Sequence, residues 1–149
     1  MVDANVAIKL ILPEIHSQAA LRLRDSDYEL LVPDFLVPEI VNILWKRVRR
    51  SEMRLDEAKN DLAALSALPW QIYPSLPLMP TALSIAVRVQ QAVYDCVYLA
   101  LAVSNKCQMV TADKRFYNAV SSYAKTSPLG KNEKNYYWGN GTGYQSVST

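Results

Sequence analysis

Four carboxylates spread along the chain have the type and placement to bind a divalent cation together. Asp3 and Asp113 each end a short apolar run typical of a strand, whereas Glu39 and Asp95 each lie near the start of a helical segment. Ligands of open α/β sheets bind at the carboxyl ends of the strands, which is where Asp3 and Asp113 are expected. Helices that begin at this edge would bring Glu39 and Asp95 to it. We therefore expect one shared site.

Such a site predicts a hard cation. Four negative charges repel one another, so they are gathered more easily around a positive ion. Oxygen ligands favour Mg²⁺ or Mn²⁺ over zinc, and the sequence has one histidine and two cysteines without CxxC spacing. A bound cation of this kind lowers the pKa of a water molecule and stabilises charge on a leaving oxygen. The chemistry indicated is hydrolysis of a phosphodiester.

Each acid also has a structural explanation when it is taken alone. Glu39 and Asp95 suit the positive end of a helix dipole, and Asp113 suits the N-cap of the helix that follows it. For a single position this explanation is the stronger one. The argument for a site therefore depends on the four positions together and on the residues around them.

The elements that must position these acids follow an alternating pattern. Short apolar runs alternate with longer segments of helical period, which predicts an α/β fold with a mainly parallel central sheet of about four to five short strands between two layers of helices. The expected strands are Met1–Asp3, Glu29–Pro33, Gln71–Tyr73 and Met109–Thr111. The expected helices begin near Pro13, near Pro38, after Asp56 as N-cap, near Pro80 and near Tyr94.

Length and composition predict one domain and a tail. The chain has 149 residues, half of them hydrophobic, which is enough for one core. We expect a nuclease-like domain over residues 1–125 and a weakly ordered polar tail over residues 126–149, where Gly, Ser, Thr, Asn and Tyr dominate. No apolar run approaches the ~20 residues of a membrane span, and the first residues lack a signal-peptide pattern, so a soluble, cytoplasmic protein is expected.

The residues around the four acids resemble the motifs of the PIN-domain family. The matching segments are Val2–Ala7 (VDANVA), Pro38–Trp45 (PEIVNILW), Tyr94–Ala102 (YDCVYLALA) and Val110–Phe116 (VTADKRF). Each segment alone is a weak signal, but their order and approximate spacing agree with the family from Val2 to about Val120. Within that family the chain is most similar to toxins of the VapC type.

This resemblance implies an activity, a cofactor and partners. It implies a three-layer PIN fold and a Mg²⁺- or Mn²⁺-dependent endoribonuclease that cleaves single-stranded or structured RNA. It also implies the toxin of a toxin–antitoxin pair, a homodimer, and an antitoxin protein that blocks the site. By position, Asp3, Glu39, Asp95 and Asp113 match the acidic quartet that binds metal and catalyses, Thr111 matches a supporting hydroxyl residue, and Asn5 matches a polar residue near the metal.

Substrate contacts are expected from cations, because Lys and Arg attract phosphates in a salt-dependent way. Lys114 and Arg115 directly follow Asp113, so we expect them to bind RNA beside the site together with Asn5. For the basic run from Lys46 to Arg54, a solvated helix face is an equally good explanation. For Tyr94 we expect packing in the core, with stacking on a base as the alternative.

Two other functions remain to be weighed. Only Met1 and Val2 precede Asp3, and the tail is unusual, which together suggest a PIN-like module that binds RNA or a protein without cutting. Intact acids at all four positions argue against it. An unrelated phosphate-binding α/β domain would need a glycine-rich turn after a strand. The sequence has only four glycines, none before Gly130, so this turn is absent.

Overall fold

The computed structural model describes residues 1–12, 17–24, 27–126, 136–139 and 144–146. Its strands form two groups. In one group β1 (Leu30–Pro33) pairs in parallel with β2 (Trp70–Tyr73). In the other, β3 (Met109–Thr111) pairs in parallel with β4 (Tyr136–Gly139), and β4 pairs antiparallel with β5 (Tyr144–Ser146).

The first three residues lie between β1 and β3 and join the two groups. The Val2 N–H donates to Leu31 O at 3.0 Å, the Val110 N–H donates to Met1 O at 2.9 Å, and the Asp3 N–H donates to Val110 O at 3.2 Å. The expected strand Met1–Asp3 is therefore present only as an isolated parallel bridge between Val2 and Val110. It is no longer than this because a helix begins at Ala4.

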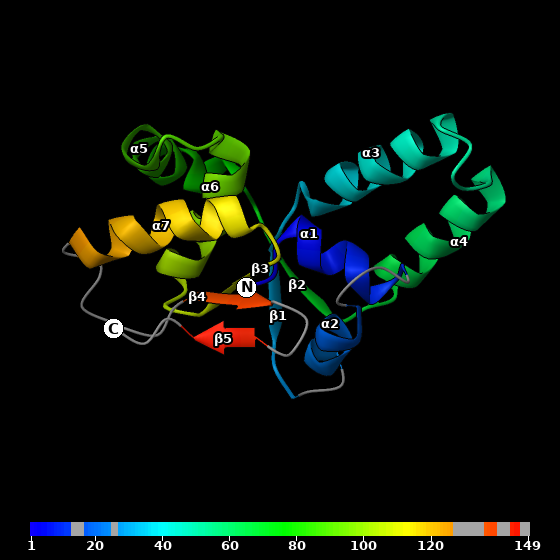
Figure 1. Cartoon of the computed structure of the whole chain (residues 1–149), viewed down its shortest axis with the longest axis horizontal. Helices are drawn as coiled ribbons and strands as arrows, with labels where there is room; N and C mark the ends of the chain where they lie inside the picture. The colour runs from blue at the N-terminus through cyan, green and yellow to red at the C-terminus, as the bar shows by residue number, and fades with distance from the viewer. Residues whose placement is uncertain (13–16, 25–26, 127–135, 140–143, 147–149) are drawn as a thin grey trace.

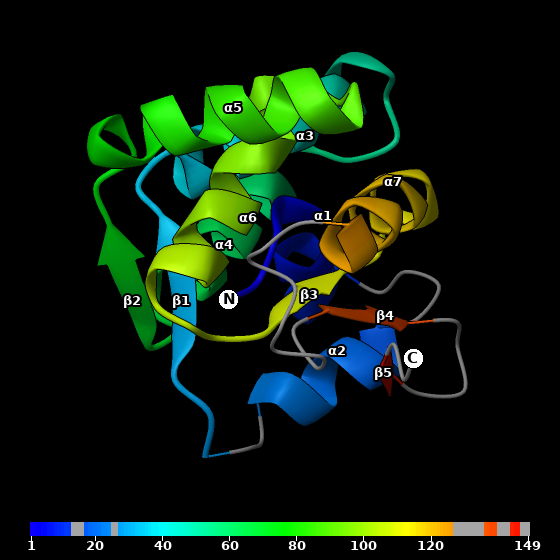
Figure 2. The same cartoon turned by 90° about the vertical axis from the view of Figure 1, so that its left-hand side faces the viewer.

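Helices lie on both sides of this sheet, which confirms the α/β class. In Figures 1 and 2, the helices α5 (Met79–Val89), α6 (Val93–Ser104) and α7 (Lys114–Thr126) lie on one side. On the other side lie α1 (Ala4–Ala7), α3 (Leu36–Arg49) and α4 (Leu55–Ser66). None of the described helices combines the length and the apolar character needed to cross a bilayer.

The helices α3 and α4 form a hairpin that extends away from the sheet (Figure 1). The turn between them includes Ser51 in the left-handed region, with φ 57°. The N-cap of α4 is Arg54, so the expectation of Asp56 at this position is wrong. The reason is local: the Glu57 carboxylate accepts a hydrogen bond from the Arg54 N–H at 2.7 Å and fixes the start of the helix there. Asp56 lies in the first turn instead.

Most of the other predicted ends of helices and strands lie close to the ends in the structure. The strand Met109–Thr111 has its predicted bounds, and β1, β2, α5 and α6 each begin one residue away from the expected position. The start expected near Pro13 lies outside the described residues, and α2 (Ser17–Arg24) follows. The sequence reasoning missed α1 and the 3₁₀ helix η1 (Ile8–Leu10), because elements this short show no helical period.

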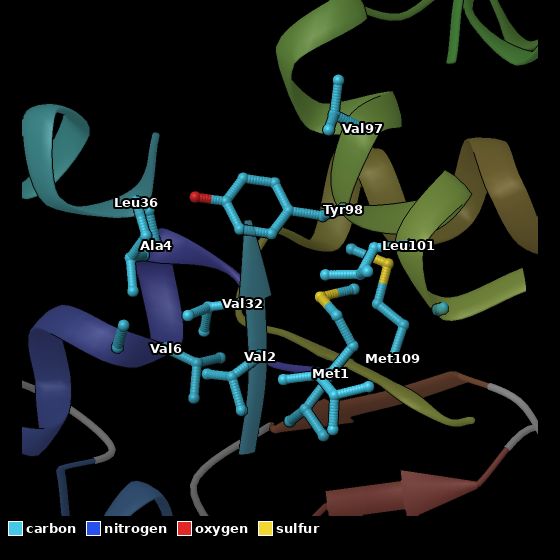
Figure 3. Packing of buried hydrophobic residues seen from close by; sticks show 14 of the residues in the cluster. Met1, Val2, Ala4, Val6, Val32, Leu36, Val97, Tyr98, Leu101 and Met109 are labelled. Atoms are coloured by element: carbon cyan, nitrogen blue, oxygen red, sulfur yellow. The ribbon is translucent and has the colours of Figure 1, made fainter. Parts of the chain in front are cut away.

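The core lies on both sides of the sheet, against α6 on one side and against α1, α3 and α4 on the other. Figure 3 shows Val2 and Val32 of the sheet side by side, with Met1 and Met109 below the ring of Tyr98. Every residue of α6 from Cys96 to Ala102 is buried, so this helix is enclosed on all sides. Its position is therefore fixed by packing, and so is that of Asp95 in its first turn.

The predicted boundary after residue 125 lies near the end of α7, at Thr126. Within residues 126–149 the structure describes β4 and β5, which extend the sheet beyond β3. The other residues of this segment lie outside the described part of the chain. Both the domain boundary and the weak order of the tail stay predictions.

Candidate functional site

A small pocket lies where the central strands end. The four predicted acids line it, and each comes from a different part of the chain. Asp3 ends the first extended segment, Glu39 and Asp95 lie in the first turns of α3 and α6, and Asp113 follows β3. The remaining lining residues are Ala4, Asn5, Tyr98, Met109 and Phe116. The fold thus gathers the four carboxylates at one edge of the sheet.

Asp3 is the most deeply placed of these acids. Its side chain is the N-cap of α1, with Oδ1 accepting from the Val6 N–H at 2.8 Å, and the residue is only 5% exposed. The pKa of Asp3 is raised to about 7. Burial is the largest cause, hydrogen bonds from Thr111 and Val6 lower the pKa, and the charges of Glu39 and Asp113 raise it. Near neutral pH, protonated and charged forms of Asp3 are therefore both populated.

Asp113 has a similar local role at the start of α7. Its Oδ1 accepts from the Arg115 N–H at 2.8 Å and from the Phe116 N–H at 3.0 Å. The Asp113 N–H in turn donates to Thr111 Oγ1 at 3.0 Å. Thr111 is buried behind the pocket and does not line it. Its hydroxyl bonds to Asp3 and to the Asp113 backbone, so it holds the two strand ends in one geometry.

Glu39 is held by a residue that the sequence reasoning missed. The Tyr98 hydroxyl donates to Glu39 Oε2 at 2.7 Å, and Figure 3 shows this hydroxyl pointing from α6 toward α3. Burial raises the pKa of Glu39, the Tyr98 hydrogen bond lowers it, and the charge of Asp95 raises it. Burial and Glu39 also raise the pKa of Tyr98, so the phenol stays a donor. Its position three residues after Asp95, on the same face of α6, was the available signal.

Asp95 and its neighbour Tyr94 differ in exposure. Asp95 is half-buried, and its pKa is raised by burial and then by the charge of Asp113. Tyr94 is 70% exposed, so the expectation that it packs in the core is wrong. Its ring packs edge to face with the ring of Phe35, with 6.3 Å between centroids. The first turn of α6 leaves this side chain outside the core that the rest of the helix fills.

The three expected substrate residues lie in two places. Asn5 is exposed and lines the pocket. Lys114 and Arg115 are exposed at the first two positions of α7 and are not among the residues that line the pocket. Asp113 turns back to cap the helix, which leaves these two side chains on its outer surface.

The residues of the pocket fit a hard cation. Burial and repulsion between the carboxylates raise the pKa values of Asp3, Glu39 and Asp95, because both disfavour the charged form. A bound cation would favour the charged form. In the described part of the chain, no three or more His, Cys, Asp or Glu side chains form a group that could hold a metal ion by themselves. Mg²⁺ keeps several water ligands and takes one or two protein carboxylates, so an open arrangement of oxygens suits it.

Comparison with known proteins gives consistent results. The PIN domain model matches residues 1–120, which include all four acids. A relative named ribonuclease VapC3, from Pyrobaculum aerophilum, is 32% identical over 77% of this chain and 89% of its own length. The crystal structure of PAE2754 from the same organism has a similar fold, with a TM-score of 0.63 and 23% identity, over 79% of this chain and 76% of that chain. The chain belongs to the PIN-domain family.

Proposed function

We propose that the protein is a Mg²⁺- or Mn²⁺-dependent endoribonuclease that cleaves phosphodiester bonds of single-stranded or structured RNA. The observation that carries this proposal is the pocket lined by Asp3, Glu39, Asp95 and Asp113, three of which have raised pKa values. Membership of the PIN-domain family and similarity to a relative named as a ribonuclease support it.

In this proposal the four acids are the catalytic and metal-binding residues. The bound cation supplies an activated water and stabilises charge on the leaving oxygen. Thr111 positions Asp3 through its hydroxyl, and Tyr98 positions Glu39, so two of the acids are oriented before substrate arrives. Asn5 offers an exposed amide at the pocket to the RNA. Lys114 and Arg115 add positive charge at the adjacent start of α7.

The decisive test is cleavage of a mixed pool of single-stranded RNA by the purified protein, with Mn²⁺ and with EDTA. We expect cleavage only with Mn²⁺, and we expect Asp95→Asn to abolish it while leaving the folded state intact. The matched control is Asp56→Asn, because Asp56 is exposed on α4 and does not line the pocket. Cleavage by Asp95→Asn at the wild-type rate would refute the mechanism.

The VapC-type resemblance extends the proposal to partners. We propose that the protein is the toxin of a toxin–antitoxin pair, acts as a homodimer, and is blocked by its antitoxin. Growth arrest on expression, relieved by co-expression of the adjacent gene, tests the antitoxin. Light scattering of the purified protein tests the dimer, and a monomeric mass would contradict it.

One observation favours the alternative of a module that binds RNA or protein without cutting. Among the residues described, no three potential ligands enclose a single ion position. Calorimetric titration with Mn²⁺ separates the two functions. The nuclease predicts saturable Mn²⁺ binding that is weakened by Asp95→Asn, whereas the module predicts none.

A further inference from the structure

The face of α3 that carries Glu39 into the pocket continues outward as a basic surface. Lys46 is seven positions after Glu39, so the helical repeat places both on one face of α3, and Arg50, eleven positions after Glu39, is the C-cap residue at the end of that face. Glu39 lines the pocket, whereas Lys46 and Arg50 are exposed. The buried residues Leu36, Ile40 and Leu44 occupy a neighbouring face. Figure 1 shows that α3 leads away from the sheet toward the tip of the hairpin.

The positive charge on this face is available to a ligand. Within the described ranges, no acid forms an ion pair with Lys46. Arg50 meets Glu52 at 3.9 Å, with both side chains at least half exposed, and such a surface pair contributes little. By contrast, Arg47 acts on Asp61, whose pKa is raised by burial and by Glu57 and lowered by the charge of Arg47. Only one side of α3 therefore presents cations in line with the pocket.

Trp45 and Arg49 lie on the face of α3 next to the one that carries Lys46. Trp45 is 51% exposed, and the Arg49 guanidinium carbon lies 4.7 Å from the centroid of its ring. Surfaces that bind single-stranded nucleic acid combine cations that follow the backbone with aromatic rings on which bases stack. Lys46, Trp45, Arg49 and Arg50 form such a combination, which we call the α3 stripe.

We propose that an RNA strand leaving the pocket runs along the α3 stripe, with phosphates on Lys46 and Arg50 and a base against Trp45. This inference rests on the proposed nuclease function, because it continues the path of the substrate. From Glu39 to Arg50 the helix rises roughly 16 Å. That length accommodates about five nucleotides at a stacked spacing of about 3.4 Å. The stripe therefore contacts only those RNA substrates that are long enough to extend beyond the pocket.

Two double variants test the stripe. Lys46→Gln/Arg50→Gln removes two charges from it, and Arg88→Gln/Lys106→Gln removes two exposed charges from α5 and from the loop before β3. Binding of a fluorescein-labelled oligouridine of about 12 nucleotides is measured by anisotropy in EDTA over a range of salt. We expect the stripe variant to bind roughly tenfold more weakly, with a log–log salt slope smaller by about 1.4. We expect the control to match wild type.

Cleavage with Mn²⁺ gives an independent readout. For the stripe variant we expect a higher KM with little change in kcat, and a larger loss of kcat/KM on substrates of about 12 nucleotides than on those of about 4. A wild-type salt slope in the stripe variant would overturn the inference. So would tighter binding of polyglutamate than of oligouridine, which would assign the stripe to an acidic protein.

The outcomes separate the two proposals. If wild type cuts RNA and the stripe variant behaves like the control, the nuclease stands and the stripe inference fails. If the stripe variant shows the expected change in salt slope but wild type never cuts RNA, the nuclease fails and the stripe remains an RNA-binding surface.

Discussion

Asp3 and Asp113 follow neighbouring extended segments with the same local structure but with different surroundings. In both, Oδ1 accepts a hydrogen bond from the N–H three residues later, at 2.8 Å from Val6 and at 3.0 Å from Phe116. Asp3 is buried at the centre of the sheet, whereas Asp113 is half-buried beside it. The pKa of Asp3 is raised to about 7, with burial as the largest cause. A local capping motif thus directs the side chain, whereas its depth in the fold sets its charge.

The largest expected effect concerns the role that we propose for both aspartates, which is to bind the metal. Asp3→Asn and Asp113→Asn each remove a proposed ligand, and a metal contributes several kcal/mol to stabilising the transition state. We expect each variant to lose at least about 100-fold in single-turnover cleavage with Mn²⁺. Asp56→Asn serves as the exposed control. Full activity in either pocket variant would remove that residue from the catalytic set.

The next effect concerns the deep burial of Asp3. The pKa of Asp3 is about 7 in the folded protein against an ordinary value near 3.8, so the native state binds more protons between these values. Stability of the metal-free protein therefore falls as pH rises through this window, by about 4 kcal/mol at most. The raised pKa values of Glu39 and Asp95 act in the same direction.

Thermal unfolding in EDTA measures this effect. We expect a higher Tm at about pH 5 than at about pH 8. Asp3→Asn keeps the shape of the side chain without its charge, so it should flatten the profile and raise Tm at the higher pH. A wild-type Tm that is constant over this range would contradict the burial argument.

A smaller effect is expected at the link between the two aspartates. Thr111→Val keeps the shape of the side chain but removes the hydroxyl that bonds to Asp3 and accepts from the Asp113 N–H. Asp3 then keeps only its hydrogen bond from Val6, and the Asp113 N–H loses its acceptor, which should lower the free energy of unfolding by about 1–3 kcal/mol. Urea unfolding measures the loss, with Thr111→Ser as the control that keeps the hydroxyl. Equal stability of the Val and Ser variants would show that the link contributes nothing.

The smallest effect extends the comparison to the acids on helices. Tyr98→Phe removes the hydrogen bond to Glu39, which is half-buried, so we expect a loss of about 1 kcal/mol in unfolding free energy. We also expect about tenfold weaker Mn²⁺ binding, because the carboxylate is no longer oriented. The matched control is Tyr94→Phe, since Tyr94 is 70% exposed. If the two variants bind Mn²⁺ with the same affinity, the positioning role of Tyr98 is refuted.

Much of the fold could be predicted because its signals are local. The apolar run Met109–Thr111 is the strand that its composition indicates, and α3 ends in the basic residues that suit its dipole. The N-cap of α4 and the short helix α1 were not predicted. The N-cap of α4 depends on which of several polar side chains hydrogen-bonds to a particular N–H. The helix α1 is too short to show a helical period in its sequence.

The sequence by itself determined which acids are present, their order along the chain, the capping by Asp113, and the helical repeat that places Lys46 and Arg50 in line with Glu39. The tertiary structure decided that acids from four distant segments line one pocket. It also decided that Tyr98 bonds to Glu39 across 59 positions and that Tyr94 is exposed. These features depend on which surfaces pack together and exclude water. Burial and distance are properties of the whole fold, so no single segment encodes them.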